Sequence, residues 1–444
     1  MNNRISGMFL RFMLAAVAAF VMTGCGIYGT FKGPQYEITD DAYGDIADGD
    51  TVSLGSVDWR DMFGDPTLCA LIDTALTNNV DLQSALLQIE QAQASLRSAK
   101  LAFLPSVDVS PSASYDGSWS VQLPVNASWE IDLFGSLRNA KKEKMAELLQ
   151  QDAYAQAVRS QLIATVATTY YTLLALDAQK EIYALTEQSW RKNVDVMRQL
   201  MQAGRYNSAS VNQTEANYYG ICNNLIDIDQ QIRQTENQLC SLLGWTPRTV
   251  ERGRLEAWSV PETLSVGVPV SVLANRPDVR QAEYALASAF YVTNAARSAF
   301  YPSLTISGSY DFRHTLYNAL GSLLEPLLKR GQLNANLKIA KAQQQQAELA
   351  FRQQVIDAGI EVNDAFVAVK SAQAKCENYD KQVENLEKAV RDTQLTMKYG
   401  STTYLEVLTA QQTLLEAQIG RIANKLSEIS STITLYQALG GGAY

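Results

Sequence analysis

Two very long stretches of the chain carry apolar residues at helical spacing. The first runs from Ser136 to Ala203 without Gly or Pro, and the second runs from Gln332 to Tyr399 with only Gly359. At about 1.5 Å of rise per residue, each would form a helix roughly 100 Å long. The heptad-like apolar positions are Ile163, Val166, Tyr170 and Leu173 in the first stretch, and Val355, Gly359, Val362, Phe366 and Val369 in the second. This spacing predicts coiled-coil helices packed side by side, with Gln and charged residues on their wetted faces.

Between residues 105 and 134 the pattern changes to a period of two. Apolar and polar residues alternate before Gly117 and again after it, which predicts two antiparallel strands joined by a turn. The return strand carries Trp119 and Trp129, which would lie roughly 23 Å apart along a membrane normal at a tilt of about 45°. That height suits the apolar belt of a membrane barrel, and Trp residues are typical of its edges. A soluble hairpin with one face on a core would alternate equally well.

A second, weaker alternation occupies residues 302–330. Its outgoing segment alternates from Leu304 to Phe312, but the return segment does not alternate and contains Pro326. One chain therefore offers about four strands, and so few strands cannot close a barrel. Because open strand edges are not tolerated in lipid, we expect the chain to oligomerise. Two copies would supply about eight strands and three about twelve, and a duct lined by long helices favours the larger number.

The chain contains an internal two-fold repeat. The segment that begins at Asn78 matches the segment that begins at Asn275. Further matched pairs, at nearly the same spacing, are Leu104 with Tyr301, Gly135 with Gly331, Tyr170 with Phe366, Gly204 with Gly400, and Leu243-Gly244 with Leu439-Gly440. We therefore expect two halves, residues 67–244 and 270–444, each built as helix, hairpin, long helix, turn and helix. Residues 245–269, rich in Pro and Gly, would link them.

The N-terminal residues have the pattern of a targeting segment. Basic residues precede an apolar run from Phe12 to Met22, which is too short to span a bilayer but suits a signal peptide of residues 1–24. The run ends in small residues immediately before Cys25, as in a bacterial lipobox, so Cys25 is the predicted lipidation site. Residues 25–66 would then form a lipid-anchored N-terminal segment. The alternative is an ordinary signal peptide that happens to contain a Cys.

Composition narrows the possible chemistry. The chain has 444 residues, a formal net charge of −9 and a single His, His314. An acidic balance argues against nucleic-acid binding, which usually needs a basic face. No nucleophile-elbow motif or phosphate-binding loop occurs, so we expect no enzyme activity, no cofactor and no metal site. The cysteines that follow Cys25 show no metal-ligand spacing and are predicted to be small buried hydrophobes; they are Cys69, Cys222, Cys240 and Cys376.

Four motifs, in order along the two-fold repeat, resemble the TolC-like outer-membrane efflux proteins, specifically the lipoprotein branch serving resistance-nodulation-division pumps. They are Trp59 to Pro66 (WRDMFGDP), Trp129 to Gly135 (WEIDLFG), Asn275 to Glu283 (NRPDVRQAE) and Ala438 to Gly442 (ALGGG). The resemblance covers nearly the whole mature chain. It implies a mainly α fold with a small β part, in which a homotrimer jointly forms a transmembrane β-barrel and a long α-helical coiled-coil barrel.

The resemblance also implies a cellular role. The trimer would lie in the outer membrane, contacting its lipid, with a lipid anchor and a periplasmic helical extension. It would be a passive exit duct in a tripartite efflux system, joined to a periplasmic adaptor (membrane fusion) protein and an inner-membrane resistance-nodulation-division transporter. Alternatives are a lipid-anchored coiled-coil protein that spans the periplasm without a pore, or a channel for type I protein secretion or metal-ion efflux. A tether would not need the hairpin with its two Trp residues, and the exported substrate stays open.

In such proteins the duct narrows at the turns that join the long helices to the helices after them. The resemblance places an apolar ring at Leu405 and acidic rings at Glu406 and position 409, where this chain has Thr409. The gate charge would therefore rest mainly on Glu406. Alternatively, Leu405 packs on the adjacent helix and Glu406 is an ordinary surface charge. The tips that would contact the adaptor carry Gly204, Arg205, Gly400 and Ser401.

Lipidation can be tested by removing the thiol. Cys25→Ala is expected to abolish incorporation of a labelled fatty acid and to slow maturation, because the thiol is the acylated group. Cys222→Ala serves as the matched control and should label as the wild type does. Mass spectrometry that finds an unmodified mature N-terminus at another residue would contradict the lipoprotein assignment.

Overall fold

The computed structural model describes residues 29–33, 54–122, 125–258, 275–308, 330–399 and 402–443. These residues fold as two compact units, each assembled from three stretches of chain. Unit 1 takes its described residues from Met1–Ile38, Ala85–Ala155 and Pro277–Ile356. Unit 2 takes its described residues from Thr39–Ser84, Gln156–Arg276 and Asp357–Tyr444. Each unit therefore mixes residues from both sequence repeats.

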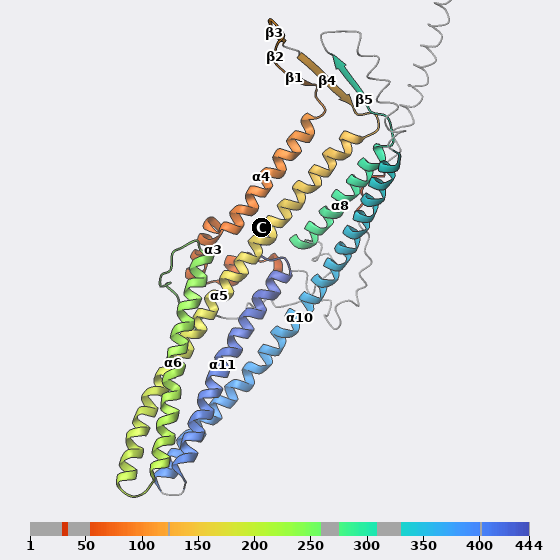
Figure 1. Cartoon of the computed structure of the whole chain (residues 1–444). Helices are drawn as coiled ribbons and strands as arrows, with labels where there is room; N and C mark the ends of the chain where they lie inside the picture. The colour runs from red at the N-terminus through yellow and green to blue at the C-terminus, as the bar shows by residue number, and fades with distance from the viewer. Residues whose placement is uncertain are drawn as a thin grey trace, which may run out of the picture. The chain divides into compact units, whose positions relative to one another are not determined.

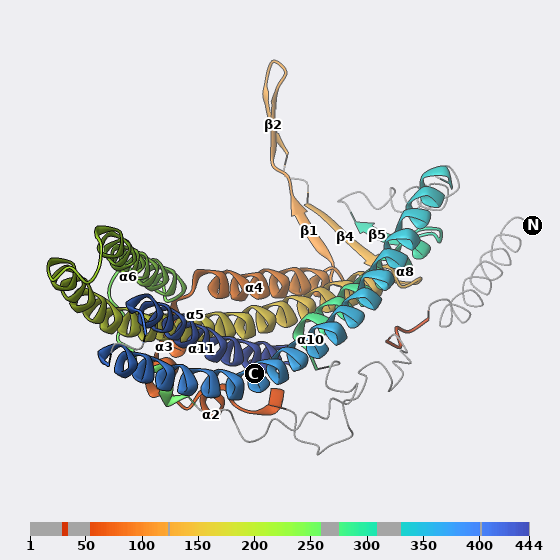
Figure 2. The same cartoon turned by 90° about the horizontal axis from the view of Figure 1, so that it is seen from below.

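Helices make up most of the described chain (Figures 1 and 2). They are η3 (Leu54–Ser56), α2 (Trp59–Phe63), α3 (Pro66–Asn78), α4 (Val80–Leu101), α5 (Ser136–Gln202), α6 (Ser208–Leu242), η4 (Leu255–Ala257), α8 (Pro277–Ser298), α10 (Arg330–Lys398) and α11 (Tyr404–Ala438). The two long helices predicted from the sequence are α5 and α10. Their observed bounds lie within two residues of the prediction. None of the described helices combines the length and the apolar composition needed to cross a bilayer.

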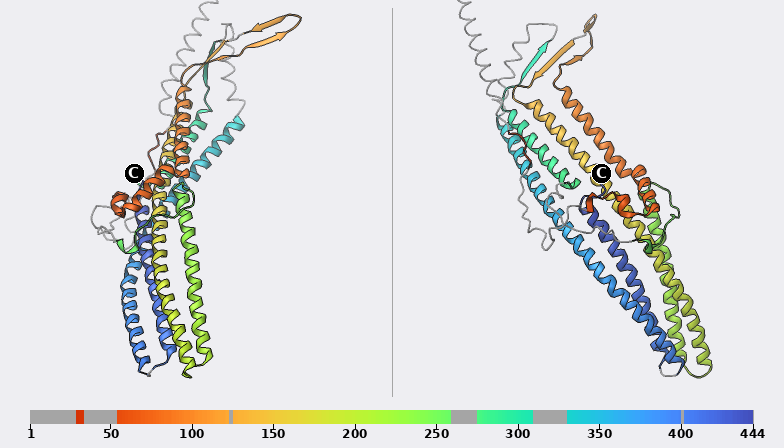
Figure 3. Two further views of the ribbon diagram at one scale, coloured as in Figure 1. Left: turned by 90° about the vertical axis from the view of Figure 1, so that its left-hand side faces the viewer. Right: turned by 180° about the vertical axis from the view of Figure 1, so that it is seen from behind.

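The predicted apolar seams form the core of unit 2. Ile163, Val166, Tyr170 and Leu173 are almost completely buried along α5, and Val362 and Val369 are buried along α10. Polar contacts between helices fix their relative positions within this unit. The Arg198 guanidinium on α5 lies 2.8 Å from Glu215 on α6, and Arg421 on α11 lies 2.8 Å from Asp380 on α10. The two helix pairs run side by side in both views of Figure 3.

The strands lie in unit 1 and confirm the predicted first hairpin. They are β1 (Ser106–Val109), β2 (Ser112–Tyr115), β3 (Trp119–Gln122), β4 (Val125–Ile131) and β5 (Leu304–Gly308). β2 pairs with β3 across the turn at Gly117, whose φ is 74°, and β1 pairs with β4. β5 pairs antiparallel with β4, which gives the sheet order β1-β4-β5. The rest of the predicted second hairpin lies outside the described residues.

The repeated motif has a structural role in each half. Asn79 donates from its side-chain amide to the Leu242 carbonyl at 3.1 Å, at the C-terminal end of α6. The matching position in the second half, Arg276, donates to the Ala438 carbonyl at 2.8 Å, at the end of α11. Both motifs thus satisfy a carbonyl that a helix end leaves unpaired. At the same helix ends, Gly244 and Gly440 have φ values of 68° and 84°, and the glycine repeat supplies this left-handed conformation.

The prediction that the cysteines are buried hydrophobes is correct only for Cys240. Cys69, Cys222 and Cys376 are half-buried, and all four are free thiols. Cys376 lies 3.6 Å from the carboxylate of Glu428, so it is part of a polar contact. This contact could not be predicted, because a cysteine in a helix seam can face either apolar side chains or a buried carboxylate.

Tyr170 ties three segments of unit 2 together. Its hydroxyl donates to Asp65 Oδ2 at 2.8 Å and accepts the Gly253 N–H at 3.0 Å. Asp65 Oδ1 meanwhile caps α3 by accepting the Thr67 N–H at 2.8 Å. Burial raises the pKa of Tyr170 to about 12. The stabilisation from this hydroxyl is therefore complete below its ordinary pKa of about 10 and is lost as the pH rises through the folded value.

Tyr170→Phe is expected to lower the free energy of unfolding by about 1–3 kcal/mol, because a carboxylate oxygen and a backbone N–H lose their partner. Tyr171→Phe is the matched control, since the Tyr171 hydroxyl makes no hydrogen bond with the described residues. Denaturant unfolding of the purified protein measures both variants. Equal losses in the two variants would contradict the assigned role of Tyr170.

Candidate functional site: the paired helix tips

The first helix tip is the turn between α5 and α6. Gly204, with a φ of 71°, follows the end of α5, and the Arg205 N–H donates to the Leu200 carbonyl at 2.9 Å. Asn207 then caps α6, because its Oδ1 accepts the Ser210 N–H at 3.0 Å. A Cβ at position 204 would meet no other atom, so the turn needs glycine only for its positive φ. The predicted tip residues Gly204 and Arg205 are both exposed at this turn.

The second tip lies between α10 and α11. Thr403 is the N-cap residue of α11, but its side chain makes no capping hydrogen bond. Instead, the Thr402 hydroxyl donates to the carboxylate of Glu406 in the first turn. A carboxylate at this position is also favoured by the positive end of the helix dipole. The predicted tip residues Gly400 and Ser401 lie outside the described residues.

Two tyrosines join the tips. The backbone N–H of Tyr404 donates to Tyr206 Oη at 3.1 Å, and the two ring centroids are 6.3 Å apart. Tyr404 is 3% exposed and belongs to an apolar cluster below the tips. The buried members of this cluster are Trp190, Met197, Val211, Ile221, Tyr404 and Leu408. Burial raises the pKa of Tyr404, so its hydroxyl stays neutral, and it has no hydrogen-bond partner among the described residues.

The predicted gate residues share one exposed face at the start of α11. Leu405 is 65% exposed, and Glu406 and Thr409 are exposed beside it. The Thr409 hydroxyl donates back to the Leu405 carbonyl at 2.9 Å, which occupies it within the helix. Val407 is buried on the opposite face. Within one chain, Leu405 is thus largely exposed and Glu406 is an exposed surface charge, so both the gate and its alternative stay predictions.

A groove of about 560 Å³ lies between α5, α6 and α11 in unit 2. Small residues from two helices open it, namely Ala216 and Gly220 on α6 and Gly420 on α11. A Cβ at position 420 would lie 2.8 Å from the Tyr379 ring, so this glycine also permits close packing with α10. Trp190 lines the groove, and its buried Nε1 has no hydrogen-bond partner among the described residues.

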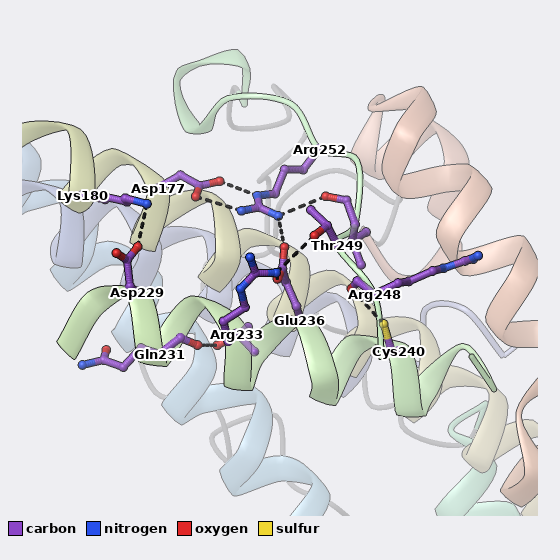
Figure 4. Close-up of polar contacts among 12 residues, drawn as sticks. Asp177, Lys180, Asp229, Gln231, Arg233, Glu236, Cys240, Arg248, Thr249 and Arg252 are labelled. Atoms are coloured by element: carbon purple, nitrogen blue, oxygen red, sulfur yellow. Dashed lines mark hydrogen bonds and ion pairs between the residues drawn. The ribbon is translucent and has the colours of Figure 1, made fainter. Parts of the chain in front are cut away.

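An arginine in the segment after α6 clamps α5 and α6 together (Figure 4). Arg252 binds both carboxylate oxygens of Asp177 on α5 and lies 2.6 Å from Glu236 Oε1 on α6. The second oxygen of Glu236 accepts from Arg233 at 3.1 Å, so this buried carboxylate is fully paired. This clamp joins α5 to α6, and it could not be predicted from the sequence because its partners are far apart in the chain.

The two predicted membrane-edge tryptophans are both accessible on the first hairpin. Trp119 is 75% exposed and lies near Tyr115, with ring centroids 5.4 Å apart and ring planes tilted by 55°. Trp129 is 42% exposed, and its Nε1 donates to the Phe103 carbonyl at 2.9 Å. Large exposed aromatic side chains on a narrow hairpin suit a membrane interface, where an apolar ring and a polar group are both satisfied.

We find no metal-binding cluster in the described part of the chain. No group of three or more His, Cys, Asp or Glu side chains there could hold a metal ion. The tips consist of two helix pairs that are joined at one end by Tyr206 and Tyr404. Beside this contact, α11 exposes an apolar and an acidic side chain. Unit 2 thus carries a joined pair of helix tips, and unit 1 carries an exposed aromatic hairpin.

Comparison with known proteins identifies the class. The outer membrane efflux protein family matches residues 71–245 and 268–441, and these two matches correspond to the two sequence repeats. The chain belongs to this family, and it is an outer-membrane efflux channel protein. The resemblance to outer-membrane efflux proteins inferred from the four motifs is thereby confirmed, and so is the mainly α fold class. Membership of the lipoprotein branch stays a prediction.

Individual relatives span almost the full length. The antibiotic efflux pump outer membrane protein ArpC of Pseudomonas putida is 27% identical, with 97% of this chain and 95% of ArpC covered. The cation efflux system protein CusC of Escherichia coli K12 is 26% identical, with 97% and 99% covered. Among solved structures, the open state of the Neisseria gonorrhoeae MtrE outer membrane channel superposes with a TM-score of 0.83 at 25% identity, covering 94% of this chain and 99% of MtrE.

The contact between the tips can be tested at Tyr206. Tyr206→Phe removes the acceptor of the Tyr404 N–H, which is worth about 1 kcal/mol, so amide exchange in the first turn of α11 should quicken roughly fivefold. Hydrogen exchange with mass spectrometry measures this. Tyr219→Phe, which removes an exposed hydroxyl from the same unit, should leave the exchange unchanged. If Tyr206→Phe also leaves it unchanged, the hydrogen bond does not hold the tips together.

Proposed function

We propose that this chain is one protomer of a homotrimeric exit duct. The duct passively carries small molecules out through the outer membrane after an inner-membrane pump has selected them. The observation that carries the proposal is the joined pair of tips with Leu405 and Glu406 on an exposed face of α11. In an isolated chain, the exposed Leu405 side chain would lie in water at a cost in free energy. In a ring of copies around an axis, the same side chains would contact one another.

Unpartnered apolar residues in unit 1 support assembly with further copies. On α4, Leu87 and Leu101 are exposed and lie two heptads apart, on one face of the helix. On α10, Leu349 and Ile356 are exposed and lie one heptad apart. A monomer in water rarely leaves two such stripes uncovered. Because the stripes belong to different helices, a ring in which one copy's α4 meets the next copy's α10 would cover both.

The strands support insertion as part of a shared barrel. Within the described residues, β1 and β5 each pair on one side only. In lipid, the unpaired N–H and C=O groups at these edges would each cost several kcal/mol. Neighbouring copies in a closed ring would supply the missing pairs. This requirement favours the duct over a lipid-anchored tether, which would not need the hairpin.

The helix tips and the groove near them suit contact with a partner protein. The exposed turn at Gly204 and Arg205 and the groove beside Gly420 suit a helical hairpin of a periplasmic adaptor, because small residues let helices approach closely. An inner-membrane resistance-nodulation-division transporter would then supply the cargo. Relatives named for antibiotic efflux and for cation efflux match with nearly equal identity. We therefore assign choice of cargo to the pump, with type I secretion as the alternative pathway.

The gate follows from the same assembly. Three Leu405 side chains around an axis would form an apolar ring, which can close a narrow pore by dewetting. Three Glu406 carboxylates beside it would place like charges where the field is focused, so the pore should favour cations. Residue Thr409 adds no charge, and its hydroxyl is already bonded within the helix.

Planar-bilayer conductance of the purified full-length protein tests the gate. Leu405→Ser should raise the conductance severalfold, because it removes the apolar ring. Glu406→Gln should lower the preference for cations, because it removes the ring of charge. The matched controls are Leu185→Ser and Glu251→Gln, which change an exposed Leu and an exposed Glu elsewhere in unit 2. Wild-type behaviour of both gate variants would place the constriction elsewhere.

A further inference from the structure

The ends of α4, α5 and α8 in unit 1 lie next to the strands (Figures 1 and 3), and the residues at these ends include many basic ones. We call this group the basic collar; its members are Arg97, Lys100, Arg138, Lys141, Lys142, Lys144 and Arg297. The carboxylates on the adjoining ends of β4 and α5 are Glu130, Asp132, Glu143 and Glu147, so basic residues outnumber acidic ones in the collar. The chain as a whole has a formal net charge of −9. This contrast indicates a local partner of negative charge.

Internal ion pairs account for only part of the collar. Arg138 lies 3.0 Å from Asp132, and Lys144 lies 3.0 Å from Glu147. The remaining lysines have no carboxylate partner within the described residues. Two of them instead lie over aromatic rings: Lys141 Nζ is 6.0 Å from the centre of the Phe103 ring, and Lys142 Nζ is 5.5 Å from that of Tyr291. Cation–π contact positions these ammonium groups but leaves their hydrogen-bond donors available.

Helix stability explains the basic residues at the ends of α4 and α8 but not those at the start of α5. Lys100 lies at the C-terminal end of α4, where the helix dipole favours a cation. Arg138, Lys141 and Lys142 lie in the first two turns of α5, at the end where the dipole favours anions. Cations at that end gain nothing from their own helix, so the stabilising anion has to come from outside it.

Aromatic side chains lie beside the basic residues, where the helices join the strands. Trp129 on β4 is hydrogen-bonded to the Phe103 carbonyl, directly beside the ring under Lys141. The Phe134 ring stacks on Tyr301 with centroids 4.9 Å apart and planes at 16°. Aromatic rings and basic residues at one level form the composition found at a membrane–water interface. From Ser136 to Lys142 the rise along α5 is roughly 9 Å, similar to the thickness of a headgroup layer.

We propose that the basic collar binds the phosphate groups of anionic phospholipids in the membrane leaflet that adjoins the helices. This inference rests on the proposed insertion of the hairpin, because only an inserted barrel brings the collar to headgroup depth. Lys100, Lys141 and Lys142 supply the donors, and the neighbouring aromatic rings contact the glycerol and upper acyl region. The collar thereby fixes the depth of the barrel and the orientation of the helices to the membrane.

The test uses the purified full-length protein in mixed micelles that contain phosphatidylglycerol or phosphatidylcholine, with bound lipid counted by native mass spectrometry. The wild type should retain phosphatidylglycerol more strongly than phosphatidylcholine, and added salt should weaken this preference. The triple variant Lys100→Gln, Lys141→Gln, Lys142→Gln should bind phosphatidylglycerol about fivefold more weakly for each lysine removed. Inorganic phosphate should not displace the lipid.

The matched control is Lys192→Gln, Lys370→Gln, Lys375→Gln, which removes the same charge from exposed lysines of unit 2, one of them also over an aromatic ring. The control should retain lipid as the wild type does. Equal retention in the collar variant and the wild type overturns the proposal, and so does displacement by inorganic phosphate. Should the collar variant fail to fold, equal retention of the two lipids by the wild type overturns it.

Conductance in planar bilayers separates this proposal from the function on which it depends. Wild-type protein that inserts and conducts, but shows no lipid preference, leaves the duct intact and refutes the collar. Wild-type protein that neither inserts nor conducts refutes the duct, and the collar with it. A change in ion selectivity of the collar variant with unchanged lipid retention would place the lysines in the pore and refute lipid binding.

Discussion

The structure depends on the rule that backbone groups within a bilayer must all be hydrogen-bonded. The sheet in unit 1 has the order β1-β4-β5, and its two outer strands pair on one side only within the described residues. In water this would be an ordinary small sheet, but in lipid its edges are too costly to leave open. One chain therefore specifies part of a barrel, and the proposed assembly would cover the exposed Leu and Ile residues on α4 and α10 with further copies.

Much of this architecture could be predicted from the sequence because it follows from periodicity. A period of two located β1 to β4, and a helical period without Gly or Pro located α5 and α10 almost to the residue. The Tyr206–Tyr404 contact and the Arg252 clamp could not be predicted, since their partners lie far apart in the chain and have no counterpart in the other repeat. Tyr206 corresponds to Thr402 in the second half, so comparing the halves gave no signal.

Equivalent positions in the two sequence repeats make different contacts. Tyr170 bonds to Asp65 and Gly253, whereas its counterpart Phe366 has no hydroxyl and lies under Lys370 instead. Asn79 and Arg276 differ as residues yet satisfy equivalent helix ends. Both repeats thus keep a side-chain hydrogen bond to the carbonyl at the C-terminal end of their last helix. The tips differ more, and it is the second tip that presents Leu405 and Glu406.

A chain whose strand edges need partners in lipid should be stable only as a closed trimer. Light scattering of the full-length protein in detergent, corrected for bound detergent, measures the mass of the assembly. We expect a single species with three times the mass of one chain, unchanged on dilution. A well-folded monomer with the full helical signal would contradict it, because its strand edges and helix stripes would then be stable without a partner.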